Sequence, residues 1–493
     1  MTLSSPPRPR GVVAAGHPDT VAAAIEMLRA GGNAYDAAVA AGFAAAVAEP
    51  GLSSLAGGGF LLARTAGSDG RRPEEVLFDF FVDTPGRGRS GAASPPELTP
   101  VVVRFKGADQ VFHTGHGSVA VPGCLAGYLH VHERLGRLPL RDVVAPAVRF
   151  AREGVVIGPQ QAAVVRLLEP ILTVTEEGRA RYLVNGAAYT DDAVMINEPL
   201  SAFLAAIGDG EIRGFDDPEL AALIEADMLA RGGVMTAEDL RSYRVVERTP
   251  LAAWHRGARF LTNPAPSYGG TLIARALMAL SSQGAVPAYG SGAALRQLAD
   301  TLDEVTRFHT TPRLTSSKGT THVSIADDEG NLASMTTSNG SCSGVILPGT
   351  GVMANNIMGE ADLHPAGFHT AEAGERVGSM MSPSILLPAD SEPVVLGSGG
   401  SERIRSAITQ VLVALLDHGL SLPEAVAAPR IHWDGTTVQA EPGFAAQALE
   451  ELEADRPINV WQETDLFFGG VHAVRPSGVC VGDGRRGGST ATA

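Results

Sequence analysis

Positive charge, aromatic side chains and cysteines are all scarce in this sequence. Of its 493 residues, 38 are Lys or Arg and 54 are Asp or Glu, which gives a formal net charge of −16 and a pI of about 5.3. Nucleic-acid binding depends on clustered positive charge, so this balance excludes a nucleic-acid binder of the usual electrostatic kind. Aromatic residues make up only 5% of the chain, so its core is expected to consist mainly of small aliphatic side chains.

The three cysteines, Cys124, Cys342 and Cys480, are far apart and odd in number. They form neither a disulfide framework nor a CxxC metal motif, and they fit a reducing compartment. The first twenty residues contain no apolar stretch long enough for a signal peptide. The apolar run Ala37–Val47 is too short to cross a bilayer. We therefore expect a soluble cytoplasmic protein that binds no membrane and needs no metal or organic cofactor.

Hydrophobic periodicity and turn residues predict helices and strands in a mixed order. The expected helices are His17–Arg29, Asn33–Ala48, Leu125–Leu135, Leu140–Glu153, Pro218–Ala230, Ala237–Tyr243, Thr271–Leu280 and Arg403–Asp417. The expected strands are Phe60–Arg64, Glu75–Phe81, His322–Asp327, Leu332–Thr336, Ser384–Leu387, Val394–Gly397 and Thr437–Ala440. Strands at both ends of the chain flank a long helical block, which predicts an α+β fold with a non-local sheet, built as one large domain over residues 1–493.

Hydroxyl side chains gather where the expected strand at His322 begins. Gly319-Thr320-Thr321-His322 opens the strand, and the Thr- and Ser-rich run 336–341 follows one hairpin later. Threonine is a good strand former, which is one sufficient explanation. A second explanation is catalytic, since a threonine hydroxyl becomes a nucleophile when a base takes its proton, and the residue's own free amine is one such base. That explanation requires the chain to be cut between Gly319 and Thr320.

Two other patterns could support chemistry, and each also has a structural explanation. The sequence Gly397-Ser398-Gly399-Gly400-Ser401 lies between a strand and a helix, where backbone N–H groups can bind an oxyanion, although ordinary glycine turns also look like this. The thirteen histidines include no HExxH motif, so a metal site is not expected. His322 lies beside the threonine pair, where either a structural or a catalytic role is open.

The threonine and glycine motifs above, together with further segments of the chain, occur in an order and spacing that resemble the γ-glutamyltranspeptidases, which are N-terminal nucleophile hydrolases. The resemblance runs almost end to end, and GTTHVSIADDEGN (Gly319–Asn331) is its most specific element. The other matching segments are GGNAYDAAVAAGFAAAVAEP (Gly31–Pro50), SSLAGGGF (Ser53–Phe60), VPGCLAGYLHVHERLGRLPL (Val121–Leu140), APAVRFAREG (Ala145–Gly154), NPAPSYGG (Asn263–Gly270), MANNIMGE (Met353–Glu360), SMMSPSILL (Ser379–Leu387) and GSGGSERI (Gly397–Ile404).

The resemblance implies a four-layer αββα sandwich and self-cleavage before Thr320, which would give fragments 1–319 and 320–493. Thr320 would then be the nucleophile and, through its new α-amine, the base. Gly399 and Gly400 would supply oxyanion N–H groups, and Ser338, with Thr337 as a nearby choice, would be the second hydroxyl that supports the nucleophile. Asn339 would contact the substrate.

The same resemblance places substrate-binding residues, but the chain departs from the family there. The family holds a glutamyl α-carboxylate with an Arg after the strand expected at Glu75–Phe81, and here only Arg87 and Arg89 in PGRGR are candidates. The acidic residue for the substrate amine falls at Glu360, with Asp362 next. Paired serines of the family read as Ser379 followed by a methionine.

These motifs together imply a self-processing amidohydrolase or acyltransferase that works through an acyl-enzyme. The expected donor is a γ-glutamyl amide such as glutathione, and the acceptor is water or an amine. One alternative is an acylase for another acyl compound, of the cephalosporin type or from a secondary-metabolite pathway. Another is an uncut homologue that serves as a scaffold or binding module. The two fragments are expected to stay together as a heterodimer, with a higher oligomer also open.

Overall fold

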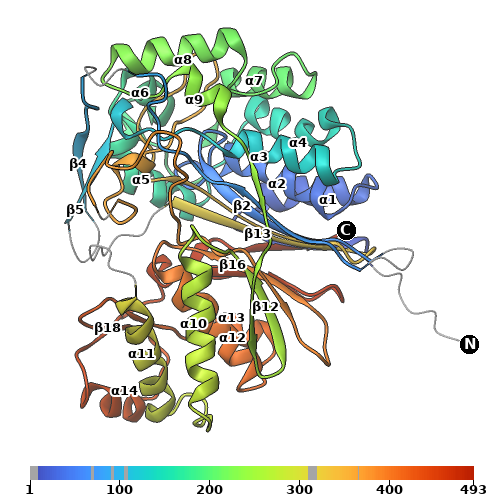
Figure 1. The fold of residues 1–493 in the computed structure, drawn as a ribbon, viewed down its shortest axis with the longest axis vertical. Helices are drawn as coiled ribbons and strands as arrows, with labels where there is room; N and C mark the ends of the chain where they lie inside the picture. The colour runs from blue at the N-terminus through green and yellow to red at the C-terminus, as the bar shows by residue number, and fades with distance from the viewer. Residues whose placement is uncertain (1–8, 68–71, 90–93, 105–108, 309–318, 365) are drawn as a thin grey trace, which may run out of the picture.

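The computed structural model describes residues 9–67, 72–89, 94–104, 109–308, 319–364 and 366–493 (Figure 1). Its centre is a pair of packed antiparallel sheets. The first sheet has seven strands in the order β10 (Val246–Arg248), β3 (Glu75–Phe80), β2 (Gly58–Arg64), β14 (Leu332–Gly340), β13 (Gly319–Asp327), β1 (Gly11–Ala15) and β22 (Ser489–Thr492). The second has six, in the order β11 (Leu251–His255), β12 (Ala258–Thr262), β15 (Ser384–Leu387), β16 (Val394–Gly399), β20 (Gly470–Val474) and β21 (Cys480–Val481).

Helices cover the outer face of each sheet, which completes four layers (Figure 1). The first sheet is covered by α1 (Pro18–Arg29), α2 (Ala34–Ala48) and α3 (Cys124–Leu135), and α4 (Leu140–Glu153) packs against α2. The helices that extend this block are α5 (Pro159–Leu172), α6 (Glu176–Tyr182), α7 (Glu198–Gly208), α8 (Pro218–Ala230) and α9 (Ala237–Ser242). The second sheet is covered by α10 (Gly269–Ser282), α12 (Arg403–Leu416) and α13 (Leu422–Ala427). The predicted αββα sandwich with a large helical block is confirmed.

Smaller elements lie at the edges of this sandwich. A three-stranded sheet consists of β17 (Ile431–Trp433), β18 (Val438–Ala440) and β19 (Ile458–Val460). It shares a small hydrophobic core with the helices α11 (Gly292–Arg307) and α14 (Ala446–Glu453). Three two-stranded sheets pair β4 (Thr99–Arg104) with β5 (Asp109–Thr114), β6 (Val155–Val156) with β9 (Val194–Met195), and β7 (Leu183–Val184) with β8 (Ala187–Ala188). Within the described residues, none of the helices is both long enough and apolar enough to span a membrane.

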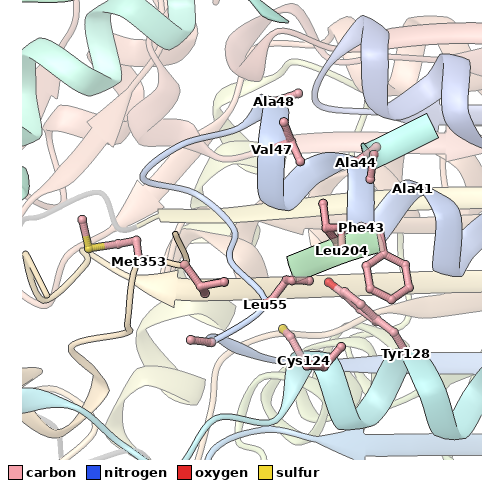
Figure 2. Close-up of a cluster of buried hydrophobic side chains, with 14 of the residues drawn as sticks. Ala41, Phe43, Ala44, Val47, Ala48, Leu55, Cys124, Tyr128, Leu204 and Met353 are labelled. Carbon is pink, nitrogen blue, oxygen red and sulfur yellow. The ribbon is translucent and has the colours of Figure 1, made fainter. Parts of the chain in front are cut away.

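Helix α2 shows how a core of small side chains brings the layers close together. Asn33 caps it, because the Asn33 side chain accepts from the backbone N–H of Asp36 and the Asp36 carboxylate accepts from the Asn33 N–H. Almost every side chain of α2 is buried, and most are alanine, so both helix neighbours and sheet can approach closely. Phe43 meets Tyr128 of α3 edge to face, with 5.3 Å between ring centroids (Figure 2).

The central hairpin β13–β14 carries the threonine motif and is fixed at its turn. The Asp327 carboxylate accepts from the backbone N–H groups of Glu329 (3.1 Å) and Asn331 (2.9 Å), and Gly330 has a φ of +94°. Both nine-residue strands are entirely buried. A fixed turn sets the register of the whole hairpin, and therefore sets which residues meet at its far end.

Candidate active site

The far end of the hairpin places Thr320 directly opposite Ser338 in the antiparallel register. The Thr320 hydroxyl donates to Ser338 Oγ across 3.3 Å, and Ser338 Oγ donates to the Gly319 carbonyl oxygen across 2.5 Å. Ser338 Oγ also accepts from the backbone N–H of Gly340 at 3.1 Å. Ser338 is therefore held between the hydroxyl of one residue and the carbonyl of the residue before it, which are the nucleophile and the electrophile of the predicted cut.

Gly319 has no space for a side chain. A Cβ atom there would overlap the carbonyl oxygen of Gly51 and would lie 2.6 Å from the carbonyl oxygen of Gly340. The strand pairing is also irregular between Gly319 and Thr320. Only glycine fits this position, and it lets the Gly319 carbonyl lie against Ser338.

Gly399 and Gly400 come to the same place from the other sheet, at the end of β16. A Cβ on Gly399 would lie 2.5 Å from the carbonyl oxygen of Thr320, so the two backbones are in close contact. The turn continues through Gly400 at φ +120° and Ser401 at φ +53°, conformations that favour glycine or need support from the surroundings. The turn thus reaches the nucleophile candidate, and oxyanion binding by its N–H groups remains a prediction.

Four of the predicted site residues line one cavity: Thr320, Ser338, Glu360 and Ser379. The other lining residues are Phe81, Ile357, Asp362, Leu363, Met380, Met381, Ser401 and Ile404, and together with Glu360 they form what we call the acyl wall. A larger cavity of about 330 Å³ lies between α10, α11 and α12, and Thr320 is not among its lining residues. The chemistry therefore points to the smaller cavity as the candidate active site.

Three predicted substrate residues do not line this cavity. The Arg87 backbone N–H donates to Asp239 and its guanidinium lies against Gly374, while Arg89 donates to the Ser94 carbonyl oxygen at 2.9 Å. Asn339 is fully buried, and its amide lies 3.4 Å from the carbonyl oxygens of residues 353 and 354. Their roles in substrate binding stay predictions without support from the geometry.

Sequence reasoning missed Arg376, which is the cation that contacts the segment after β3. Its guanidinium pairs with Asp79 (3.0 Å) and Asp83 (2.7 Å) and donates to the Phe81 carbonyl oxygen (2.8 Å). Burial raises the pKa of Asp83 to about 6, against the pull of Arg376. No local sequence pattern predicts this ion-pair cluster, because Arg376 lies almost 300 residues from Asp79 and Asp83 along the chain.

A second polar cluster anchors the opposite face of the hairpin. Glu49 accepts from the Thr20 hydroxyl at 2.7 Å, and its other oxygen lies beside the Thr321 hydroxyl above Gly16. Complete burial raises the pKa of Glu49. Neighbouring Thr321 and Thr320 thus face different layers, since successive strand residues point to opposite sides. The Thr321 side chain faces Glu49 on the helical side of the sheet, and Thr320 lines the cavity.

His322 lies between the two sheets. Its Nδ1 is 2.8 Å from the Thr336 hydroxyl and its Nε2 is 2.9 Å from the Ser324 hydroxyl. Burial holds the pKa of His322 well below its ordinary value, so the ring is neutral. Both nitrogens are engaged away from the cavity, which fits a structural role. Within the described residues, no group of three or more His, Cys, Asp and Glu side chains is placed to hold a metal ion.

Known proteins resemble this chain in both sequence and fold. The acylase ACY 1 proenzyme of Pseudomonas sp. strain V22 is 31% identical over 487 residues, which cover 89% of this chain and 86% of the relative. The glutathione hydrolase proenzyme of Escherichia coli is 27% identical over 514 residues, which cover 90% and 85%. The crystal structure of cephalosporin acylase from Bacillus halodurans superposes with a TM-score of 0.80 at 24% identity, over 100% of this chain and 98% of that one.

The model of the family described as gamma-glutamyltranspeptidase matches residues 20–314 and 291–493. The family match therefore covers both sides of the predicted cut. Together with the relatives and the two-sheet sandwich, this supports an N-terminal nucleophile amidohydrolase or acyltransferase. The chain belongs to the gamma-glutamyltranspeptidase family.

Proposed function

We propose that the chain cuts itself between Gly319 and Thr320, and that the new N-terminal Thr320 transfers acyl groups from amide donors to water or an amine. The observation that carries the proposal is the chain of hydrogen bonds from Thr320 Oγ1 to Ser338 Oγ to the Gly319 carbonyl oxygen. It joins the attacking atom to the bond under attack. The relatives named as proenzymes support the same reading.

In the self-cleavage step, Thr320 Oγ1 attacks the Gly319 carbonyl carbon. Ser338 holds the Thr320 hydroxyl and donates to the carbonyl oxygen, where negative charge develops. The C–N bond then breaks, the proton lost by the Thr320 hydroxyl is transferred to the Thr320 nitrogen, and Gly319 is left as an ester on Oγ1. Water hydrolyses this ester, which gives a carboxylate on Gly319 and a free α-amine on Thr320.

In turnover, the same hydroxyl attacks the amide carbonyl of a donor. The free α-amine of Thr320 serves as the base that accepts the hydroxyl proton, and then delivers it to the leaving amine. The close approach of Gly399 to the Thr320 backbone supports a role for the N–H groups of the glycine turn in binding the tetrahedral oxyanion. Water or an acceptor amine then releases the acyl group and restores Thr320.

The two fragments would remain one body after the cut. Strands β1, β2, β3 and β10 come from the part before Thr320, and they share the first sheet with β13, β14 and β22 from the part after it. The second sheet mixes the two parts in the same way, because β12 pairs with β15. We therefore propose an intimate heterodimer.

The glutathione hydrolase relatives make a γ-glutamyl amide the first donor to test. An acylase for a different acyl group is the second candidate, and a specific observation favours it. Phe81 and Met380 line the cavity, whereas Arg87 and Arg89 do not. A carboxylate on the acyl chain would therefore have no arginine partner among the described lining residues.

Substitution of Thr320 tests the proposal. Thr320→Ala should remain a single chain on denaturing electrophoresis and should hydrolyse no amide donor, because the attacking oxygen is gone. Thr320→Ser is the matched control and should retain partial cleavage and turnover, since it keeps the hydroxyl and the α-amine. A Thr320→Ala protein that still cuts itself at residue 319 would refute Thr320 as the nucleophile.

A further inference from the structure

A buried carboxyl group lies behind the nucleophile candidate, on the helical side of the first sheet. Glu49 ends helix α2 as its C-cap residue, and its side chain is 0% exposed. One of its oxygens accepts from the hydroxyl of Thr20, in the first turn of α1. The other oxygen lies beside the hydroxyl of Thr321, the residue that directly follows Thr320. Glu49 therefore connects two helices of the part before the predicted cut with the strand that begins after it.

Gly16 leaves the space in which Glu49 and Thr321 meet. A Cβ on Gly16 would lie 2.9 Å from Glu49 Oε2 and 2.9 Å from Thr321 Oγ1. Within the described residues, neither oxygen has a hydrogen-bond partner other than its neighbour in this pair. A buried polar atom that lacks a partner destabilises the fold, which favours a hydrogen bond between these two groups.

The protonation state of Glu49 suits this contact. Burial raises the pKa of Glu49, and His17 and the two threonine hydroxyls oppose this shift. Among the described residues, no Lys or Arg forms an ion pair with this carboxyl group. A neutral carboxylic acid has an O–H that can donate to the Thr321 hydroxyl, while its other oxygen accepts from Thr20.

The start of β13 has a strand neighbour on one side only. Strand β1 ends at Ala15, which pairs with Val323, whereas β14 pairs with β13 from Gly319 onward. Within the first sheet, residues 320–322 are therefore held by β14 alone. In the uncut chain these residues lie within a continuous backbone, but after the cut Thr320 is a chain end. Chain ends loosen unless other contacts hold them.

We propose that Glu49 is a positioning residue that holds Thr320 in place once the chain is cut, through a hydrogen bond to the neighbouring Thr321. The inference rests on the proposed function, because only the cut creates a chain end at Thr320. Thr321 faces the helices and Thr320 lines the cavity, so fixing one side chain also fixes the direction of the other. A loosened anchor moves the nucleophile, and a misplacement on the order of 1 Å can cost about 100-fold in rate.

Thr321→Val is the most direct test, because valine has nearly the shape of threonine but no hydroxyl. The variant should cut itself at close to the wild-type rate, since the anchor acts after the cut. Periodate oxidises an accessible N-terminal threonine, and it should attack Thr320 about 5- to 10-fold faster than in the wild type, as expected from the loss of one hydrogen bond. The intact mass of the smaller fragment follows this reaction, which needs no donor.

Turnover provides a second readout. For a γ-glutamyl anilide, kcat of Thr321→Val should fall by about 10-fold or more while KM stays unchanged, because a displaced nucleophile slows the chemical step only. Thr301→Val is the matched control, since the Thr301 hydroxyl is also buried but lies in α11, where it donates to the Gln297 carbonyl oxygen at 2.9 Å. It should change neither the periodate rate nor kcat.

Two variants of the carboxyl group separate anchoring from a general structural role. Glu49→Gln should retain most of the wild-type behaviour, because its amide N–H can donate to Thr321 and its carbonyl oxygen can accept from Thr20. Glu49→Leu can do neither and should behave like Thr321→Val. Equal behaviour of the two Glu49 variants would overturn the hydrogen-bonded anchor. The same pair decides the question if Thr321→Val does not fold.

The outcomes distinguish this inference from the proposed function. A wild-type protein that never cuts itself contradicts the proposed function. A self-cleaved Thr321→Val protein with the wild-type periodate rate and the wild-type kcat overturns the inference and leaves Thr320 as the nucleophile. A folded Thr321→Val protein that no longer cuts itself also overturns it, because the contact would then act before the cut.

Discussion

The two sides of the candidate active site are built in different ways. On one side, Thr320, Ser338 and Gly319 are linked by hydrogen bonds within a single hairpin, and a side chain at residue 319 would overlap the Gly51 carbonyl oxygen. On the other side, the acyl wall is assembled from separate segments, including Phe81 from the end of β3, Glu360 after a short 3₁₀ turn and Met380 before β15. Local geometry thus places the proposed reacting atoms, whereas long-range packing forms the wall that we propose faces the acyl group.

Among the tests of this comparison, Ser338→Ala is expected to have the largest effect, a slower rate of self-cleavage. Removing the hydroxyl takes away the donor to the Gly319 carbonyl oxygen and the partner of the Thr320 hydroxyl. Loss of one such donor typically slows a reaction about 100- to 1000-fold, so self-cleavage should slow by this amount. The rate can be followed as the decay of uncut protein on denaturing gels. Ser338→Thr keeps the hydroxyl and should cut faster than the alanine variant; equal rates for wild type and Ser338→Ala would remove Ser338 from the mechanism.

Gly319→Ala should have the next largest effect. The added methyl group overlaps the Gly51 carbonyl oxygen, which must displace the scissile carbonyl from Ser338 and Thr320. A misplacement on the order of 1 Å can cost about 100-fold in rate, and we expect self-cleavage to slow accordingly. The matched control is Gly158→Ala, where a Cβ would meet nothing within 4 Å. If both alanine variants cut at the wild-type rate, the tight fit around Gly319 has no part in cleavage.

The smallest effect concerns the packing between the sheets rather than catalysis. Burial lowers the pKa of His472 to about 4, and its Nδ1 accepts from the backbone N–H of Asp483. The folded protein therefore keeps the ring neutral, while the unfolded chain takes up a proton below about pH 6.5. The stability contributed by the neutral ring is present above pH 6.5 and is lost as the pH falls toward 4.

For a shift of this size, the loss amounts to about 3 kcal/mol of unfolding free energy. Unfolding by denaturant at pH 7 and at pH 4.5 should show it, and His472→Asn should reduce the difference between the two pH values. A substitution of the partly exposed His130 should leave the difference as it is in the wild type. A His472→Asn variant with an unaltered pH dependence would show that this ring does not control acid stability.

Local signals predicted the hairpin and many helices with close agreement. Leu140–Glu153 and Pro218–Ala230 are helices with the expected bounds. The helix expected at Asn33–Ala48 is α2, with Asn33 as its N-cap. The strand expected from His322 begins three residues earlier, at Gly319, because pairing with β14 extends it through the threonines. Strand β1 (Gly11–Ala15) was missed, since its short alanine and valine run becomes a strand only through pairing with β13 and β22.

The difference between local sequence patterns and long-range packing also explains which site residues could be predicted. Thr320 and Ser338 meet because one turn fixes one register, and both are visible in the sequence. Arg87 and Arg89 are candidates only because the family resemblance implies an Arg after β3, and in the structure the Arg87 N–H donates to Asp239 and the Arg89 guanidinium donates to Ser94. The wall depends on how the segments after β3, at 357–363, at 379–381 and at 401–404 pack together, and no local pattern encodes that arrangement.

The central claim is that the chain becomes an enzyme by cutting itself before Thr320. The most direct measurement is the intact mass of the purified wild-type protein under denaturing conditions, with the first residue of the smaller species identified. The proposed mechanism predicts two species that correspond to residues 1–319 and 320–493, with threonine at the start of the second. A single species of 51.0 kDa after long incubation would contradict it.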